Sequence, residues 1–437
     1  MEKDYKKNSI SLLGAIFLGT GVMISAGIFA LTGQIAELSS KYFPIILIIG
    51  SIVTYFSAYS YIKFSQHYPS AGGIGMYLVE AYGKGVIAST ASLMMIVSMI
   101  INQSLVARTF GSYLMTLFNQ ENNMIIIPAL GVGLLIFSLI INLSGNAFIQ
   151  GFTGIMSIVK IVGIILFSLG ALYASGFVIS FSQTSSATAN PSLIDAFASI
   201  ALAILAFKGF TTITNNGKEI VKPKKNVAKA IIFSILISLI VYLSVAFGVS
   251  GNLTVSEIIE SKDYALAEAA RPLFSGFGLY FTVSLAIIAT ITAIIASVFA
   301  VSRLIAMLAD MGMIPHKQIN ENVRTQKQTL FYTVILAIIL TIFFDLSRIA
   351  SLGAILYIAM DIVIHVGLAF KKRKDINAKQ WIVLSAIILD ALVLSAFIYV
   401  KLLSDPFIVL IAIGMILALI VMEIFFFKSK DKSESNA

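Results

Sequence analysis

The chain of 437 residues contains no cysteine, and this absence excludes disulfide bonds, thiolate metal sites and cysteine nucleophiles. Charged residues are scarce, at 12% of the sequence, whereas a soluble domain carries roughly 25%. Only three histidines occur (His67, His316 and His365), too few for a histidine-rich metal centre. Apolar residues make up 58% and the mean hydropathy is +0.96, so the composition excludes a soluble enzyme and indicates a membrane protein.

Long apolar runs are abundant. A hydrocarbon core about 30 Å thick needs roughly 20 apolar residues per helix. Twelve such runs are bounded by charge, proline or polar clusters, so the sequence predicts an all-α polytopic membrane protein with twelve transmembrane helices. The predicted spans are 10–36, 44–66, 85–117, 124–142, 152–176, 193–217, 229–250, 278–308, 329–345, 348–370, 380–402 and 406–427. The first is longer than a signal-peptide core and lacks a cleavage site, so we expect it to be retained.

The positive charges are distributed unevenly between the two sides. With the N-terminus placed inside, cytoplasmic segments hold 22 of the 30 lysines and arginines, external segments hold six, and Lys160 and Lys208 fall within spans. The positive-inside rule therefore predicts cytoplasmic N- and C-termini in the plasma (inner) membrane. The net charge of +9 reflects loops facing anionic lipid, and no nucleic-acid partner is expected.

Two spans are interrupted by glycine. The first contains Gly19, Gly21 and Gly27, and the sixth carries Lys208 and Gly209 in mid-membrane. Small residues can serve close helix packing. However, glycine-interrupted spans at corresponding places in two five-helix halves indicate an inverted-repeat transporter with its site at the midplane. Freed N–H groups at the start of a half-helix attract an anion and freed carbonyls attract a cation, so a zwitterion such as an α-amino acid fits both.

Four motifs in order resemble the amino acid-polyamine-organocation (APC) superfamily, over roughly residues 10–370. Ala26-Gly27-Ile28-Phe29 is similar to its Gly-(Ser/Ala)-Gly-Ile-Phe signature, with Ser25 standing where glycine is usual. The other matches are Asn142, Gly145, Lys160, Phe167 and Gly170; Gly209-Phe210, Glu219, Pro223, Lys225-Asn226 and Ala230-Ile231; and Ser302-Arg303, Ala306-Met307, Asp310, Gly312 and Pro315.

The resemblance implies a LeuT-type fold in which helices 1–5 and 6–10 are inverted repeats, with helices 1 and 6 broken and two further peripheral helices. It divides the chain into a cytoplasmic N-tail (1–9), a first repeat (10–176), an external linker (177–192), a second repeat (193–370), helices 11 and 12 (380–427) and a cytoplasmic C-tail (428–437).

The same resemblance implies where a substrate is held. Backbone N–H groups of Ser25, Ala26 and Gly27 would meet a carboxylate, and carbonyls of Met23, Leu205, Ala206 and Lys208 would meet an ammonium, with Phe207 in the same segment.

Lys160 lies about 12 Å deep in the fifth span, at 1.5 Å per residue. A lysine there is costly, so it either snorkels or has a partner or task. In relatives without sodium coupling, a lysine on helix 5 occupies the sodium position and bonds carbonyls of the helix 1 break, here near Gly21. Since burial disfavours a charged lysine, its proton could leave as the pocket changes shape. The resemblance thus implies proton-coupled, sodium-independent transport.

Lys208 leaves three alternatives open: an ion pair with Asp361 at matching depth, contact with a substrate side chain, or a side chain that points away. His365, one turn below Asp361, could hydrogen-bond it or be a packed group. Asp390 is expected to be interfacial or to form a dimer contact. Neutral amino acids are the default substrate. Lys208 keeps an acidic substrate open as an alternative, and Asp361 keeps an amine substrate open.

Other classes of function fit less well. No Gly-x-x-x-x-Gly-Lys-Ser/Thr motif, channel filter or His-Glu-x-x-His motif occurs, which argues against an ATPase, a channel and an intramembrane hydrolase. The prediction is a secondary active amino acid transporter, not an enzyme, with an exchanger or a non-transporting nutrient sensor as alternatives. We expect no cofactor or metal, no disulfide-linked subunit, and a monomer or homodimer whose partners are the substrate, protons and lipid.

Overall fold

A computed structural model describes residues 9–69, 73–144, 146–176, 191–314 and 322–435. Over these ranges the chain is helical and has no β-strand, apart from an isolated bridge between Ile10 and Ile220. Nine helical segments in this described part are long and apolar enough to cross a membrane, and three shorter apolar helices accompany them. The prediction of an all-α polytopic membrane protein is confirmed at this level.

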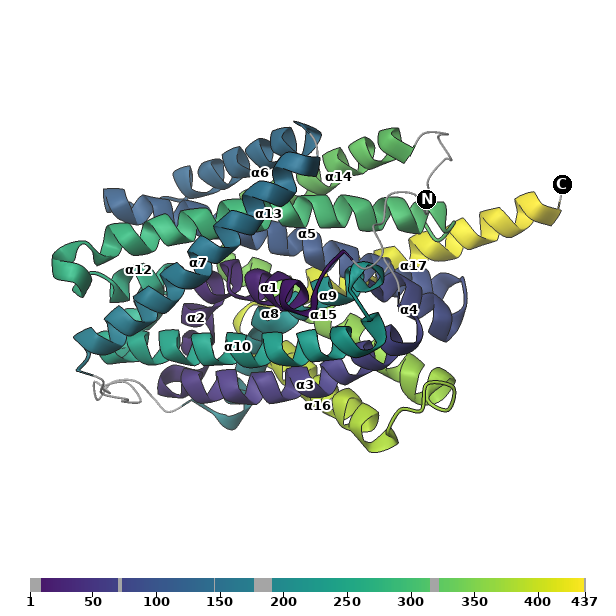
Figure 1. The fold of residues 1–437 in the computed structure, drawn as a ribbon, viewed down its shortest axis with the longest axis horizontal. Coiled ribbons are helices and arrows are strands. Elements are labelled where there is room, and N and C mark those ends of the chain that lie inside the picture. The colour runs from purple at the N-terminus through teal and green to yellow at the C-terminus, as the bar shows by residue number, and fades with distance from the viewer. Residues whose placement is uncertain (1–8, 70–72, 145, 177–190, 315–321, 436–437) are drawn as a thin grey trace.

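The long helices run roughly along the long axis of the molecule, with α12 at one end and α4 toward the other (Figure 1). Their bounds are α1 Leu12–Met23, α2 Ala26–Ser39, α3 Phe43–His67, α4 Gly73–Tyr82, α5 Val86–Met115, α6 Ile126–Ser144, α7 Asn146–Ala174, α8 Leu193–Phe207, α9 Thr211–Asn215, α10 Pro223–Asn252, α11 Val255–Glu260, α12 Ala265–Ala269, α13 Gly278–Asp310, α14 Asn322–Phe343, α15 Leu346–Gly367, α16 Gln380–Ser404 and α17 Pro406–Ser435.

Local sequence signals explain where several helices begin. Ser192 and Asp195 form a capping box at the start of α8, in which each side chain accepts a backbone N–H of the other residue. Asp345 caps α15 by accepting from the N–H of Arg348 at 2.8 Å. Pro223 is the first residue of α10. The N–H that proline lacks would have no acceptor within the helix at this position, so proline is tolerated there.

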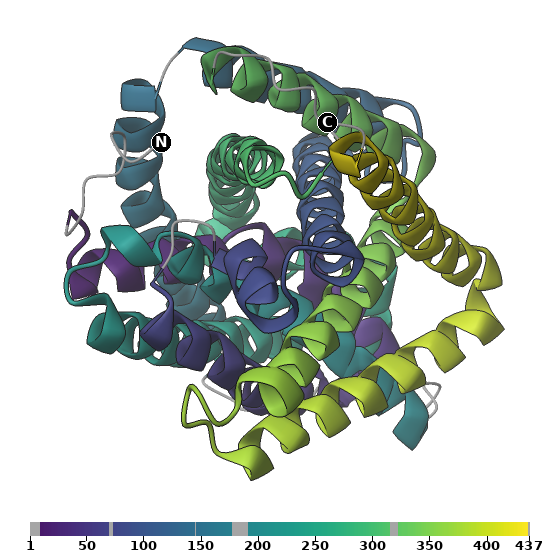
Figure 2. The same cartoon turned by 90° about the vertical axis from the view of Figure 1, so that its right-hand side faces the viewer.

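The outer helices carry apolar side chains on their exposed surfaces. Leu403 on α16 is 72% exposed and Phe425 on α17 is 68% exposed. Both helices lie at the edge of the bundle in the end-on view (Figure 2). In water such surfaces would be unfavourable, whereas lipid tails solvate them, which agrees with an integral membrane protein.

Two helical segments differ from the sequence prediction. Helix α4 lies between the second and third predicted spans, and its ten residues are too few for a search based on membrane thickness. Helix α17 continues to Ser435, eight residues past the predicted end at 427 and into the segment assigned as a C-tail. The apolar run does end there, but lysine, glutamate and serine can continue a helix in water. Residues 177–190 of the predicted linker and 1–8 of the N-tail lie outside the described residues.

Candidate functional site

The first span is interrupted between α1 and α2. Ile24 has φ −77° and ψ 66°, and the N–H of Ser25 donates to the carbonyl of Met23 at 2.8 Å, which is the geometry of an inverse γ-turn. Ala26 and Gly27 then form the first turn of α2. N–H groups at this position have no acceptor within their own helix, so the start of α2 is a favourable place for an anion.

The sixth span changes helix type at the corresponding place. Helix α8 ends at Phe207, a 3₁₀ turn covers Lys208–Phe210, and α9 follows. The 3₁₀ turn packs tightly against the break in the first span. A Cβ atom added to Gly209 would lie only 2.8 Å from the backbone nitrogen of Met23. No L side chain fits such an approach, so glycine is required for the two interruptions to touch.

Tyr242 on α10 bridges both interruptions. Its hydroxyl lies 2.5 Å from the carbonyl oxygen of Met23 and 3.1 Å from that of Ala206. One hydroxyl has a single proton to donate, so the two carbonyls share it. Tyr242 was not predicted from the sequence, because a tyrosine within a mostly apolar span does not indicate which carbonyls it will face; in the structure it is fully buried.

The four carbonyls assigned to an ammonium already accept hydrogen bonds within the protein. The Tyr242 hydroxyl donates to the carbonyls of Met23 and Ala206. The Lys208 N–H donates to the carbonyl of Leu205. The Thr211 hydroxyl donates to the carbonyl of Lys208 at 3.0 Å. The Ser25 N–H, assigned to a carboxylate, is used by the γ-turn. The Met23 carbonyl accepts from both the Ser25 N–H and the Tyr242 hydroxyl, so one of these donors would have to leave before an ammonium could bind there, and the Ser25 N–H would have to leave the turn before it could bind an anion.

A cavity of about 920 Å³ adjoins both interruptions. Ser25, Gly27 and Lys208 line its deep end, and it extends to Asn216 and to Glu219, which follow α9. There Arg303 on α13 pairs with Glu219 at 3.2 Å. Side chains from α5, α7 and α13 form much of the wall. The volume is within the range of ligand pockets, about 300–1,000 Å³, so a small molecule can reach the interrupted backbone from this end.

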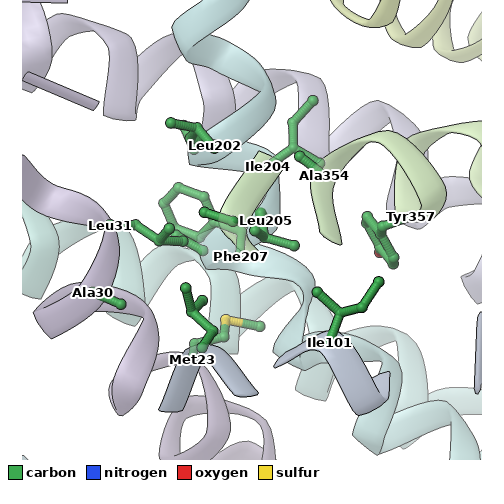
Figure 3. Close-up of a cluster of buried hydrophobic side chains, with 14 of the residues drawn as sticks. Met23, Ala30, Leu31, Ile101, Leu202, Ile204, Leu205, Phe207, Ala354 and Tyr357 are labelled. Carbon is green, nitrogen blue, oxygen red and sulfur yellow. The ribbon is translucent and has the colours of Figure 1, made fainter. Parts of the chain in front are cut away.

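Apolar packing fills the space beyond the interruptions. Met23, Leu31, Leu205 and Phe207 are each at most 4% exposed and lie close together, with Tyr357 from α15 nearby (Figure 3). These side chains come from α1, α2, α8 and α15. The packing leaves the deep end of the cavity closed toward α2.

A second cavity, of about 830 Å³, lies at the other end of α2 and is lined by charged side chains. Lys262 pairs with Glu37 at 2.5 Å, and Gln34 donates to Asp263 at 2.6 Å. These contacts join α2 to the segment between α11 and α12. The segment 251–277, between the seventh and eighth predicted spans, thus contains two short helices and caps the end of α2.

Asp263 in this cap gives a pH-dependent prediction. Burial raises the pKa of Asp263 from its ordinary value of 3.8 to about 6; Asp345 and Glu37 add to the rise, and Lys262 and Arg108 oppose it. The folded protein then binds this proton more tightly than the unfolded chain, so the contribution of Asp263 to stability falls as pH rises from about 4 to about 6.

Asp263→Asn should remove that dependence, which amounts to about 1–3 kcal/mol. Thermal unfolding in detergent between pH 4 and 7 would measure it: the wild type should lose more stability than the variant as pH rises. Equal slopes for the two proteins would contradict the assignment.

Lys160 lies on α7 and is 5% exposed. It lines the same 920 Å³ cavity as Gly21. The sequence predicts that these two residues belong to one site. The expected hydrogen bond to a carbonyl near Gly21 is not formed, and the described residues offer no other hydrogen-bond or ion-pair partner to its Nζ atom.

Lys208 does not form the ion pair with Asp361. Its Nζ atom lies 5.5 Å from the centre of the Tyr357 ring and 3.5 Å from both the carbonyl and the hydroxyl of Ser98. Asp361 accepts instead from Ser57 at 2.9 Å and from Tyr61. Matching depth does not fix the direction in which a helical residue points, and Tyr357, one turn before Asp361, is the residue of α15 that faces Lys208.

Asp390 is buried, at 1% exposure, so the interfacial or dimer assignment is wrong. Its Oδ2 atom lies 3.0 Å from Nε2 of His365, whose Nδ1 lies 2.8 Å from the Ser60 hydroxyl. No direct hydrogen bond joins His365 and Asp361 within the described part. Ligand atoms of Asp361, His365 and Asp390 all lie within 4.8 Å of one another, a spacing that could hold a metal ion. Hydrogen bonds already account for the arrangement.

Comparisons with known proteins cover nearly the whole chain. A family model described as amino acid permease matches residues 10–436. The inner membrane transport protein YbaT of Escherichia coli is 29% identical over 394 residues, which cover 89% of this chain and 90% of that protein. An uncharacterized protein of Methanocaldococcus jannaschii is 26% identical over 99% of this chain and 98% of its own length. The serine/threonine exchanger SteT of Bacillus subtilis is 26% identical over 63% of this chain and 62% of its own length.

Proposed function

The chain belongs to the amino acid permease family, whose members are APC-type transporters and not enzymes, and from this we propose that it moves amino acids across the membrane by alternating access. One observation carries the proposal. The first span is broken between α1 and α2, the sixth changes from an α-helix to a 3₁₀ turn at Lys208, and these two places touch each other on the wall of one cavity. An inverted-repeat transporter needs this arrangement at its substrate site.

The proposed architecture has twelve transmembrane helices, a LeuT-type 5+5 inverted repeat with broken helices 1 and 6, and cytoplasmic termini. Helices α1 and α2 would together form helix 1, and α8 with α9 would form helix 6. Since the chain has no cysteine, single cysteines at Ser9 and Ser404 would test the orientation with a membrane-impermeant maleimide.

In the proposed binding mode, the substrate carboxylate accepts from the N–H groups of Ala26 and Gly27 at the start of α2. The substrate ammonium faces the carbonyls of Met23 and Ala206. Tyr242, which now donates to these carbonyls, would share them with the ammonium or rotate away. A substrate would thus reorganise contacts that join α1, α8 and α10, which is how differential binding can favour one conformation over another.

We place proton coupling at Lys160, with Gly21 on the facing helix. Its burial, its position on the cavity wall and the lack of a carboxylate partner among the described residues all support a group that can lose its proton. Transport would then need no sodium ion. Exchange is the second candidate, because the similar protein SteT is named an exchanger and the same alternating site serves both modes.

The test is uptake of a radiolabelled amino acid panel into proteoliposomes. An inward proton gradient alone should drive accumulation, and an inward sodium gradient alone should not. Uptake that needs amino acid inside the vesicles would establish exchange in place of symport. Absence of transport for every amino acid in all three conditions would overturn the proposal and favour a sensor.

A further inference from the structure

The charges on the cavity wall are unequal. Its charged lining residues are Lys160, Lys208, Glu219 and Arg303, and the last two form an ion pair with each other. Two lysines are left without an acidic partner on the wall. A cavity that holds two unbalanced cations in a low-dielectric surrounding attracts an anionic ligand.

Lys208 is the lysine that lies at the interruptions. It follows Ala206 and Phe207 directly and precedes Gly209, whose Cα approaches Met23. Its side chain leaves this backbone toward α5 and α15, where it reaches Ser98 and Tyr357. The ammonium is therefore next to the proposed position of a bound amino acid but is not part of the backbone groups that would hold its α-carboxylate.

The protein itself does not neutralise the Lys208 charge by a direct contact. The side chain is 9% exposed, and both hydrogen bonds to Ser98 are long, at 3.5 Å. The Tyr357 ring provides a cation–π contact, which offsets only part of the free energy that burial of an ammonium costs. The carboxylate of Asp361, one turn further along α15, accepts hydrogen bonds from Ser57 and Tyr61, forms no ion pair with Lys208 and acts on the lysine charge only through space.

We propose that Lys208 binds the side-chain carboxylate of the substrate, so that this transporter selects acidic amino acids such as aspartate or glutamate. The inference rests on the proposed function and specifies its substrate class. An amino acid with two carboxylates and one ammonium carries net charge −1, which balances Lys208 when bound. A neutral amino acid leaves Lys208 unpaired, so the preference differs from the neutral substrates expected as the default from the sequence.

Competition against a labelled transported amino acid in proteoliposomes tests the proposal, with aspartate and glutamate compared with their uncharged analogues asparagine and glutamine. Each pair has nearly the same shape, so the difference reports the carboxylate. A hydrogen bond to a charged partner contributes about 1.5–3 kcal/mol, so the acids should compete about 10- to 150-fold more strongly than the amides. In Lys208→Met this ratio should fall to near one, and Lys208→Arg should retain part of it.

Lys63→Met is the matched control, because Lys63 also lies beside an aromatic ring, 5.7 Å from the centre of Tyr59, but is not on the cavity wall. It should leave the ratio unchanged. If wild-type protein transports neutral amino acids and does not prefer the acids, the substrate assignment is overturned while the transport function stands. The assignment is also overturned if the wild type prefers neutral amino acids and Lys208→Met loses uptake of every amino acid to the same extent. Lys208 would then hold the α-carboxylate, which all amino acids share. No uptake of any amino acid by the wild type would instead overturn the proposed function.

Discussion

Lys160→Met is expected to reduce proton-driven accumulation of substrate to the level of protein-free vesicles. Methionine has a similar length and apolar stem but cannot carry a proton, so the variant keeps the packing of α7 and loses the proposed coupling group. The measurement is uptake of a radiolabelled amino acid under an inward proton gradient. Exchange of labelled external substrate for unlabelled internal substrate should persist, because exchange requires no net movement of protons.

The comparison of these two modes within one variant separates coupling from folding. A variant that neither accumulates nor exchanges is damaged at the substrate site or misfolded, and the prediction that exchange persists is then wrong. Accumulation at the wild-type level would show that Lys160 is not the coupling group. In that case the buried position of Lys160 on the cavity wall would need another explanation, such as attraction of an anionic substrate.

Gly209→Ala is expected to reduce transport by about 5- to 150-fold. The added methyl group would lie 2.8 Å from both the backbone nitrogen and the Cγ atom of Met23. The methionine side chain can move, but its backbone is fixed by the γ-turn, so the 3₁₀ turn and α1 must separate. Overpacking of this kind costs about 1–3 kcal/mol, and each 1.4 kcal/mol corresponds to a tenfold change in an equilibrium constant.

Gly133→Ala provides the matched control, since a Cβ at Gly133 meets nothing within 4 Å. This variant should leave uptake unchanged. Because alanine has a higher helix propensity than glycine, the variant should be at least as stable as the wild type. Uptake kinetics and thermal stability of both variants would be measured side by side. Wild-type transport by Gly209→Ala would contradict a functional contact between the two interruptions.

The sequence was sufficient for the features that depend on composition along the chain. Membrane spans follow from apolar length, and α3, α5 and α16 begin and end within two residues of their predicted limits. A backbone break in the first span near Ser25 was expected from glycine placement, whereas the sixth span stays helical and changes only to a 3₁₀ turn at Lys208–Phe210. The family was expected from four ordered motifs and is shown by the match over residues 10–436.

Features that depend on the rotation of one helix against another could not be predicted. Lys208 and Asp361 have similar depths, yet Asp361 faces Ser57 and Tyr61 on α3. Asp390 was expected at an interface or a dimer contact, but its side chain is buried and faces His365. Tyr242 contacts carbonyls more than 30 residues away in sequence, and only the packing of α10 against both interruptions identifies it. Depth follows from sequence position, whereas facing follows from tertiary packing.

The central claim is that amino acid entry is coupled to proton entry without sodium. The most direct measurement follows the luminal pH of proteoliposomes with an entrapped dye while external substrate is added in sodium-free buffer. We expect substrate-dependent acidification of the lumen that disappears in Lys160→Met and persists in Lys63→Met. Substrate uptake that leaves the luminal pH unchanged, or that occurs only when sodium is present, would contradict it.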